Sequence, residues 1–420
     1  LVGALLFMAQ LDAAATPGEY YRSHWCGKPP PEDLPFLDDR ACAKRFPTNC
    51  SREWRCPVLT HRAPPTGWAS AAPLASVRVD TSVLASVQQL QAVRFAAVLV
   101  RRTASGGVFY RYFGGPNYTQ PFETWSSSKI FAMANAAVTV ERQCPAVGGL
   151  TALTHGRLGF TPLGDLATIV CSYDRTKNYT SNSLARYFHD IGGRQQADWL
   201  VREWLGARDG ESFGGNYGEP TPPDLGFTLT AADPPRPQEA ANGVTTQSCA
   251  LDPDHSGIVI PNALSALTMV ELLKRIVLHR DLPPALRLPG VQWKDVQQEL
   301  YGSGGGTQSL FPTVEWGGMT ADTAIFMQDA AQNVMRHYGD PQTGGEWRIF
   351  SKLGAGFSSS RHVGEIVHNA YGCFPAPGVE LLYSARASVA GDAELRAAEA
   401  TLRAGINAGI RAVLRATEQA

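Results

Sequence analysis

Residues 124–137 read TWSSSKIFAMANAA, three consecutive serines followed by a lysine and an apolar run. Ser and Thr often satisfy the free N–H groups of a first helical turn, so the stretch predicts a helix from the serines to about Val140. Residues at i and i+3 lie on one helix face, which makes Ser126 and Lys129 neighbours. A hydroxyl becomes a good nucleophile when a nearby base accepts its proton. The pattern therefore fits either a helix cap or a serine beside its base.

The composition is that of a globular protein able to bury a core. The chain has 420 residues, of which 44% are hydrophobic and 18% charged. Its 37 basic and 38 acidic residues give a formal net charge of −1. This balance gives no support for a nucleic-acid or anionic-membrane partner, and we expect no nucleic acid to bind.

The first residues, LVGALLFMAQLDAAAT, resemble the end of a signal peptide. An apolar run leads to small residues, so we expect residues 1–15 to be a signal-peptide remnant and the protein to be secreted or periplasmic. A short buried helix is the alternative.

Residues 16–74 read as an irregular extension rich in Cys and Pro. The chain has eight cysteines, and four of them fall between Cys26 and Cys56. An even count after an export-like start predicts disulfides. Metal binding is less favoured, because no Cys-x-x-Cys pair or clustered His motif occurs, and we expect neither a metal nor a cofactor.

Hydrophobic periodicity predicts an α+β protein. Strands come near both ends of the chain and helices lie between them, which suggests one antiparallel sheet built from both chain ends with a helical region inserted. Residues 211–262 are Gly- and Pro-rich and too long for a plain connection. We expect helices at 74–91, 126–140, 163–174, 182–206 with a break at Gly192–Gly193, 262–281, 292–302 and 393–416, a hairpin at 94–115, and strands at 346–356 and 363–375.

Two later motifs support the nucleophile reading of the serine stretch. Ser181-Asn182-Ser183 follows in the middle of the chain, and Lys352-Leu353-Gly354 stands on an expected strand near its end. With S-x-x-K before them, the chain resembles the penicillin-recognising serine hydrolases, most closely class A β-lactamases. The resemblance covers roughly residues 75–420 and implies a three-layer, β-lactamase/transpeptidase-like domain.

The resemblance also implies roles for four side chains. Ser126 corresponds to the nucleophile and Lys129 to its proton partner. Ser181 corresponds to a proton shuttle toward the leaving group, and Lys352 to a second cation. Burial and a second cation are the means by which a lysine pKa is lowered enough for it to act as a base.

Substrate contacts follow from the same resemblance. The backbone N–H groups of Ser126 and Ala355 would form the oxyanion hole. Gly354 and Gly356 would let a substrate approach the strand closely. Arg361 could bind a substrate carboxylate, although a solvated turn residue is the more ordinary interpretation.

The chain departs from the class A pattern in three places. Asn182 and Ser183 stand where those enzymes have Asp and Asn, so we expect both near the substrate but without the usual amide. Leu353 replaces a Thr or Ser whose hydroxyl contacts the substrate carboxylate, and we expect its bulk beside the charge of Lys352. Glu219 precedes a proline at about the position of the deacylating glutamate, but an exposed loop carboxylate is an equal alternative.

Disulfide pairing cannot be deduced from the sequence. Since some class A enzymes carry a cysteine on the helix that includes Cys171, the resemblance suggests pairs Cys144–Cys171 and Cys249–Cys373.

Taken together, the motifs predict a serine hydrolase that forms an acyl-enzyme on Ser126 and acts on a small-molecule or peptide amide or ester, such as a β-lactam or a cell-wall peptide. A D-alanyl-D-alanine peptidase or an esterase on the same scaffold is the alternative within enzymes. A non-catalytic secreted binding protein is the alternative outside them.

Overall fold

The computed structural model describes residues 60–61, 66–156, 159–172, 179–232, 247–254, 260–301, 319, 348–374, 379–391 and 395–418. Among them, no helix is both long enough and apolar enough to cross a membrane. The α-helices are α3 (Ser82–Ala85), α4 (Lys129–Gln143), α5 (Leu163–Ser172), α6 (Ser181–Gly192), α7 (Arg194–Trp199), α9 (Ala266–Val277), α10 (Trp293–Tyr301) and α13 (Leu395–Glu418). The strands are β1 (Thr60–His61), β2 (Ala69–Ser70), β3 (Val79–Asp80), β4 (Val93–Thr103), β5 (Val108–Gly114), β6 (Phe122–Glu123), β7 (Leu153–Gly156), β8 (Gly159–Pro162), β9 (Thr228–Thr230), β10 (Ser248–Ala250), β11 (Ala263–Leu264), β12 (Arg348–Ser358), β13 (Val363–Phe374) and β14 (Val379–Ala390).

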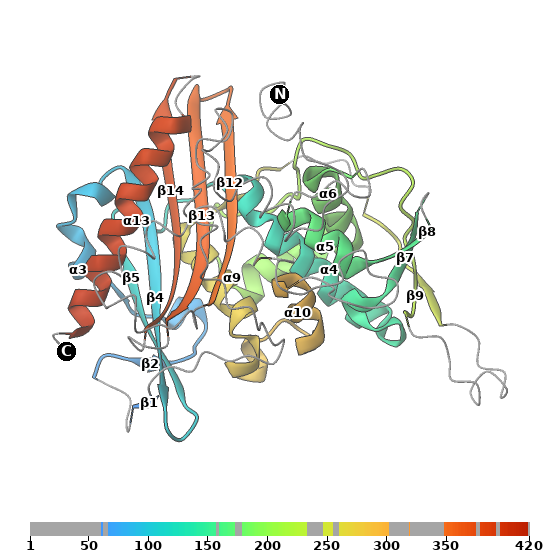
Figure 1. Ribbon diagram of the computed structural model, residues 1–420, viewed down its shortest axis with the longest axis horizontal. Helices are drawn as coiled ribbons and strands as arrows, with labels where there is room; N and C mark the ends of the chain where they lie inside the picture. Colours follow the sequence, from blue (N-terminus) through green and yellow to red (C-terminus); the bar gives the residue numbers. More distant parts are fainter. Residues whose placement is uncertain are drawn as a thin grey trace, which may run out of the picture.

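The main sheet joins the two ends of the chain, as the sequence predicts. Its strand order is β12-β13-β14-β4-β5-β2, so late strands pair with early ones across the β14–β4 ladder (Figure 1). These five ladders are antiparallel, while the short strands β1 and β3 add parallel pairs to β4 and β5. The expected fold class, an antiparallel sheet with an inserted helical region, is confirmed.

Strand β4 is buried on both faces and separates two cores. Phe95, Ala97 and Leu99 lie in the core under α13, and the alternate residues lie in the core shared with the inserted helices. This period of two is what a pleated strand imposes. Figure 1 shows α13 across one face of the sheet and helices α4, α5, α6, α9 and α10 on its other side. The sheet therefore forms the middle of three layers.

Helix α4 is the centre of the inserted region. Every residue from Lys129 to Glu141 is buried, and the helix packs against α6. A helix that is buried on every side has no polar face in contact with solvent. Any polar side chain that it carries must find its partner inside the protein.

The structure differs from the expected elements in several places. The short strands β6 to β11 were not expected; they form a four-stranded sheet, β10-β9-β7-β8, and a two-stranded sheet, β11-β6. Residues 74–91 do not form one helix: they form two 3₁₀ turns, β3 and α3. Asp80 ends β3 and accepts hydrogen bonds from the backbone N–H and hydroxyl of Ser82, which starts α3 as a new element. Strand β14 was not expected, because Leu381, Leu382 and Tyr383 are all buried and the alternation of a half-exposed strand is lost.

The expected disulfide pairs are wrong. Cys144 bonds to Cys249, which lies on β10 beside the C-terminal end of α4. Cys171 instead lies in the apolar core on α5. Cys373 is disulfide-bonded, but not to Cys249.

Leu353 does not lie where the sequence interpretation puts it. Its side chain is buried in the core under α13, on the opposite face of β12 from Lys352 and Gly354. A threonine at this position would bring a hydroxyl into an apolar layer, so its effect would be on stability before substrate choice.

Candidate functional site

The three serines of the opening stretch divide into two kinds. They form a 3₁₀ turn, Trp125–Ser128, that leads directly into α4. The hydroxyl of Ser127 donates to Thr124 O at 2.6 Å, and that of Ser128 donates to Trp125 O at 2.9 Å. Ser126 is half-buried, and within the described part of the chain its hydroxyl makes no hydrogen bond. The cap interpretation is wrong, because neither Thr124 nor Ser128 caps the helix with its side chain and the hydroxyls of Ser127 and Ser128 donate to carbonyls instead. The nucleophile interpretation of Ser126 stays a prediction.

The residue before Ser126 has an unusual backbone. Trp125 has φ 48°, in the left-handed region that a bulky residue rarely adopts. Its indole N–H donates to Glu365 Oε2 at 2.9 Å, and its ring lies against Gly356 of β12. Such conformations persist only where the surroundings hold them, and they cluster at functional sites.

Strand β12 passes against this turn at Gly354. A Cβ atom added there would lie 2.6 Å from Ser127 N, 2.7 Å from Thr124 O and 3.0 Å from Ser126 N. The glycine is therefore required by the 125–128 turn itself, whether or not a substrate approaches the strand. Ala355 follows Gly354 on the same edge strand, so its backbone also runs close to Ser126.

Lys129 joins the first motif to the second. Its side chain is fully buried, and its Nζ donates to Ser181 Oγ at 2.8 Å and to Asn182 Oδ1 at 2.7 Å. The Nζ also lies 5.5 Å from the centre of the Tyr217 ring. Three residues that the sequence predicted from separate motifs thus meet at one point.

The N-terminus of α6 presents Ser181 and Asn182 to this point, but not Ser183. Ser181 donates its hydroxyl proton to Val170 O at 2.6 Å while accepting from Lys129. Thr180 caps the helix by accepting from Ser183 N at 3.1 Å, and the Ser183 hydroxyl donates back to Thr180 O at 3.1 Å. Ser183 thus belongs to the helix cap, while the Asn182 side chain points to Lys129.

Glu219 reaches the same helix end from the long loop. Thr180 Oγ1 donates to Glu219 Oε2, and Asn182 Nδ2 donates to Glu219 Oε1 at 3.2 Å. Asn182 therefore bridges the lysine and the carboxylate. Glu219 is not a solvated loop carboxylate without contacts.

The remaining predicted cations lie at β12 and the turn after it. Lys352 is fully buried, and its Nζ donates to Leu353 O at 3.1 Å. Arg361 uses two nitrogens to bind Glu365, at 2.9 and 2.7 Å, and a third to bind Ser358 Oγ at 3.0 Å. Its guanidinium is thus already paired with a carboxylate of the protein.

Two groups at the site were missed in the sequence. Tyr217 lies over Lys129, and its OH is 3.3 Å from Ser128 Oγ; burial raises its pKa further above the usual range, so the phenol is neutral. Glu123 lies just before the turn, and burial raises its pKa to about 7. An aromatic residue two positions before Glu219 was the only signal for Tyr217.

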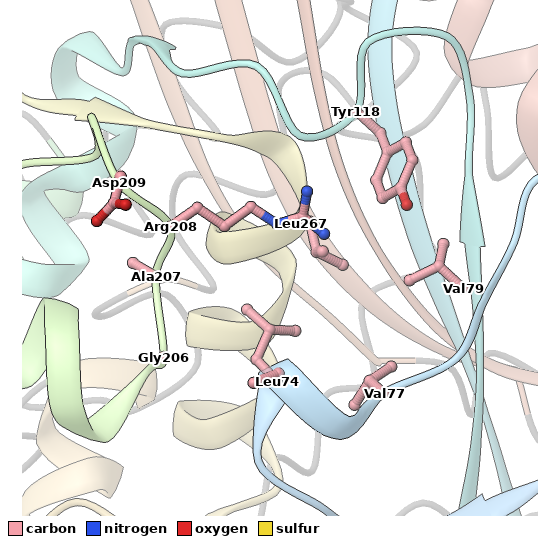
Figure 2. A pocket seen from close by; sticks show the side chains of 10 residues that line it. Leu74, Val77, Val79, Tyr118, Gly206, Ala207, Arg208, Asp209 and Leu267 are labelled. Atoms are coloured by element: carbon pink, nitrogen blue, oxygen red, sulfur yellow. The ribbon is translucent and has the colours of Figure 1, made fainter.

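The described ranges contain no group of three or more His, Cys, Asp or Glu side chains arranged to hold a metal ion. A cavity of about 540 Å³ lies elsewhere, between the 74–79 segment, Tyr118, the 206–209 loop and Leu267 (Figure 2). None of the predicted site residues lines it.

No protein-family model matches the chain, and no curated protein matches it. Solved structures similar to it include a class A β-lactamase from Mycobacterium abscessus, with 14% identity, 76% of this chain and 93% of that chain covered, and a TM-score of 0.39. The chromosome-encoded β-lactamase of Vibrio parahaemolyticus has 12% identity, covers 75% and 92%, and has a TM-score of 0.39. A β-lactamase from Burkholderia vietnamiensis has 14% identity, covers 79% and 94%, and has a TM-score of 0.38. Similarity at this level carries no argument about chemistry.

We predict that Gly354→Ala displaces the turn that carries Ser126. The new Cβ would meet backbone atoms, which cannot rotate away, so labelling of Ser126 by a fluorophosphonate should slow by at least about tenfold, equivalent to ~1.4 kcal/mol. Gly115→Ala is the matched control, because its Cβ would make only ordinary contacts at 3.4 Å. Equal labelling rates in the two variants would contradict the prediction.

Glu123 should make stability depend on pH. Burial raises its pKa from 4.5 to about 7, so the folded protein holds a proton that the unfolded chain releases. The contribution is complete below pH 4.5 and is lost as pH rises through about 7, with a slope of at most ~1.4 kcal/mol per pH unit. Denaturant unfolding of Glu123→Gln should show a shallower fall over this window. Glu141, whose pKa is also raised to about 7, supplies the dependence that remains. An unchanged slope would show that Glu123 is ionised in the folded protein.

Proposed function

We propose that the protein is a serine hydrolase that forms an acyl-enzyme on Ser126. The observation that carries the proposal is the pair of hydrogen bonds from the buried Lys129 Nζ to Ser181 Oγ and Asn182 Oδ1. Any buried lysine needs polar partners, and here both partners come from the second motif that the sequence singled out. Ser126 lies one turn before Lys129, and its hydroxyl is the group whose proton this lysine would accept.

In the proposed reaction, Ser126 Oγ attacks the acyl carbon of an amide or ester. Its proton passes to the Lys129–Ser181 pair, and Ser181 delivers a proton to the leaving nitrogen or oxygen. The backbone N–H groups of Ser126 and Ala355 would stabilise the oxyanion. Water then attacks the resulting ester, which restores Ser126 and releases the acid.

The contacts favour Glu219 as the base for the second step. Lys129 Nζ is fully buried and already donates to Ser181 and Asn182. Glu219 accepts hydrogen bonds from Thr180 and Asn182 and is only half-buried, so water can reach it.

The substrate is proposed to be a small-molecule or peptide amide or ester. The sequence motifs suggest a β-lactam, but two contacts expected for a β-lactam carboxylate are not made. Leu353 has no hydroxyl and faces the other side of β12, and Arg361 is paired with Glu365. These observations favour the alternative of an esterase or peptidase acting on acyl groups that lack that carboxylate.

We also propose where the protein resides and how its chain is divided into segments. The apolar start and the Cys144–Cys249 disulfide support a secreted or periplasmic protein with a signal remnant at 1–15, an extension at 16–74 and the hydrolase domain at 75–420.

The first test is intact-protein mass spectrometry after incubation with a fluorophosphonate and, separately, with a penicillin. We expect labelling by the fluorophosphonate, with peptide mapping placing the adduct on Ser126, since Ser127 and Ser128 use their hydroxyls in the turn. Ser126→Ala should remove labelling and keep the melting temperature. An adduct on another serine would overturn the assignment, and no adduct at all would favour a binding protein.

Glu219→Ala should acylate at the parental rate but accumulate acyl-enzyme, because the water loses its base. General-base catalysis contributes about 10²–10⁴-fold, so the lifetime of the adduct should lengthen within that range. Stopped-flow turnover of a chromogenic ester separates the two steps. Glu203→Ala, which removes an exposed carboxylate from the 200–204 turn, serves as the control. Parental turnover in Glu219→Ala would mean that the carboxylate only braces the loop.

A further inference from the structure

Loop 211–219 carries Tyr217 and Glu219 to the candidate site, but its own sequence gives it little stiffness. It contains several glycines, of which Gly215 and Gly218 have φ 62° and 78°. Glycine loses more conformational freedom on ordering than any other residue. The loop therefore depends on contacts from outside itself to hold its two functional side chains.

Asn262 supplies such contacts with its side chain. It is 1% exposed; its Oδ1 accepts from Gly214 N at 3.0 Å and from Gly215 N at 2.8 Å. Its Nδ2 donates to Asn216 O at 3.0 Å. Three consecutive loop residues, ending one residue before Tyr217, are thus bound to one amide.

The main chain of Asn262 is bound to the nucleophile turn. Its carbonyl accepts from Thr124 N at 2.8 Å and from Thr124 Oγ1 at 2.7 Å. One buried residue therefore links the loop to the segment immediately before Ser126.

The packing of the loop explains why an outside side chain must do this. A Cβ atom at Gly214 would lie 2.1 Å from Ile260 O, and one at Gly215 would lie 2.0 Å from the ring of His189. These positions have room only for glycine. The loop cannot carry its own polar side chains there, and its backbone groups need an external partner.

We propose that Asn262 is a positioning residue that fixes loop 211–219 against the nucleophile turn and so sets the rate at which the acyl-enzyme is hydrolysed. The inference rests on the proposed acyl-enzyme chemistry. Ser126 and Lys129 stand on the turn and on α4, and Lys129 Nζ is held by Ser181 and Asn182 of α6, so acylation depends on the loop only through the Tyr217 ring. Glu219 stands on the loop, so the second step depends on it directly.

Asn262→Ala removes the three loop bonds and leaves the main-chain bonds to Thr124. Labelling of Ser126 by a fluorophosphonate should stay within about threefold of the parent, while the acyl-enzyme formed from a chromogenic ester should live at least about tenfold longer. Hydrogen–deuterium exchange of the peptide covering 211–219 should become faster. Asn262→Asp keeps the acceptor oxygen and loses only the donor to Asn216, so it should lengthen the lifetime less; it also serves if the alanine variant does not fold.

Asn135→Ala is the matched control, because Asn135 is equally buried and donates to Gly193 O at 3.1 Å, at the far end of α6. It should lower the melting temperature without changing the acyl-enzyme lifetime. The inference is overturned if Asn262→Ala leaves the lifetime unchanged, or if both asparagine variants lengthen it equally. A parent that fluorophosphonate does not label at Ser126 would instead refute the proposed chemistry.

Discussion

The site is organised around one buried cation. Lys129 lies on a helix that is enclosed by the protein from its first residue, so its ammonium group cannot be solvated by water. Burying such a group without partners is costly, and the structure meets this demand with Ser181 and Asn182 at the start of α6. The demand fixes how α4 and α6 lie against each other. The position of the nucleophile turn follows, because that turn leads directly into α4.

The second constraint is steric and comes from the sheet. β12 passes so close to the turn that only glycine fits at Gly354 and Gly356. The first of these contacts involves backbone atoms next to Ser126, and the second holds the ring of Trp125 in its strained conformation. The 125–128 turn and β12 are at least 220 residues apart in the sequence, and together they define the geometry around Ser126. The hydrogen bond from the Trp125 indole to Glu365, 240 residues away, adds a contact from β13.

The sequence predicted the elements that have strong local signals. The hairpin of β4 and β5, the helices with apolar periodicity and the order of the three motifs were all visible without a structure. The expected helix at 74–91 was wrong because a single aspartate, Asp80, ends one element and starts the next. Strand β14 was missed because it is buried on both faces. The first miss arises from a local contact between Asp80 and Ser82, and the second from the burial of β14 between β13 and β4, which depends on distant residues.

From the sequence, only the site residues that belong to a recognisable motif could be predicted. Ser126, Lys129, Ser181 and Asn182 were named from the sequence; the structure brings the last three together and places Ser126 in the turn that leads into α4. Tyr217 and Asn262 were not named, since a tyrosine or asparagine in a Gly-rich loop has no pattern of its own. Leu353 and Arg361 were interpreted from their positions in or beside the third motif. The side chain of Leu353 lies on the other face of β12, and that of Arg361 is bound by the Glu365 carboxylate.

The disulfide between Cys144 and Cys249 closes a ring across 105 positions of the chain. Ser181, Tyr217 and Glu219 lie within this ring, while Ser126 and Lys129 lie outside it on the segment that leads into Cys144. A single cut by a protease anywhere inside the ring would therefore leave two fragments joined by the bond. All the side chains of the site would remain in one covalent assembly. In an oxidising and protease-rich environment, the exposed residues Gln247 and Ser248 could be nicked without separating the lysine from the groups that surround it.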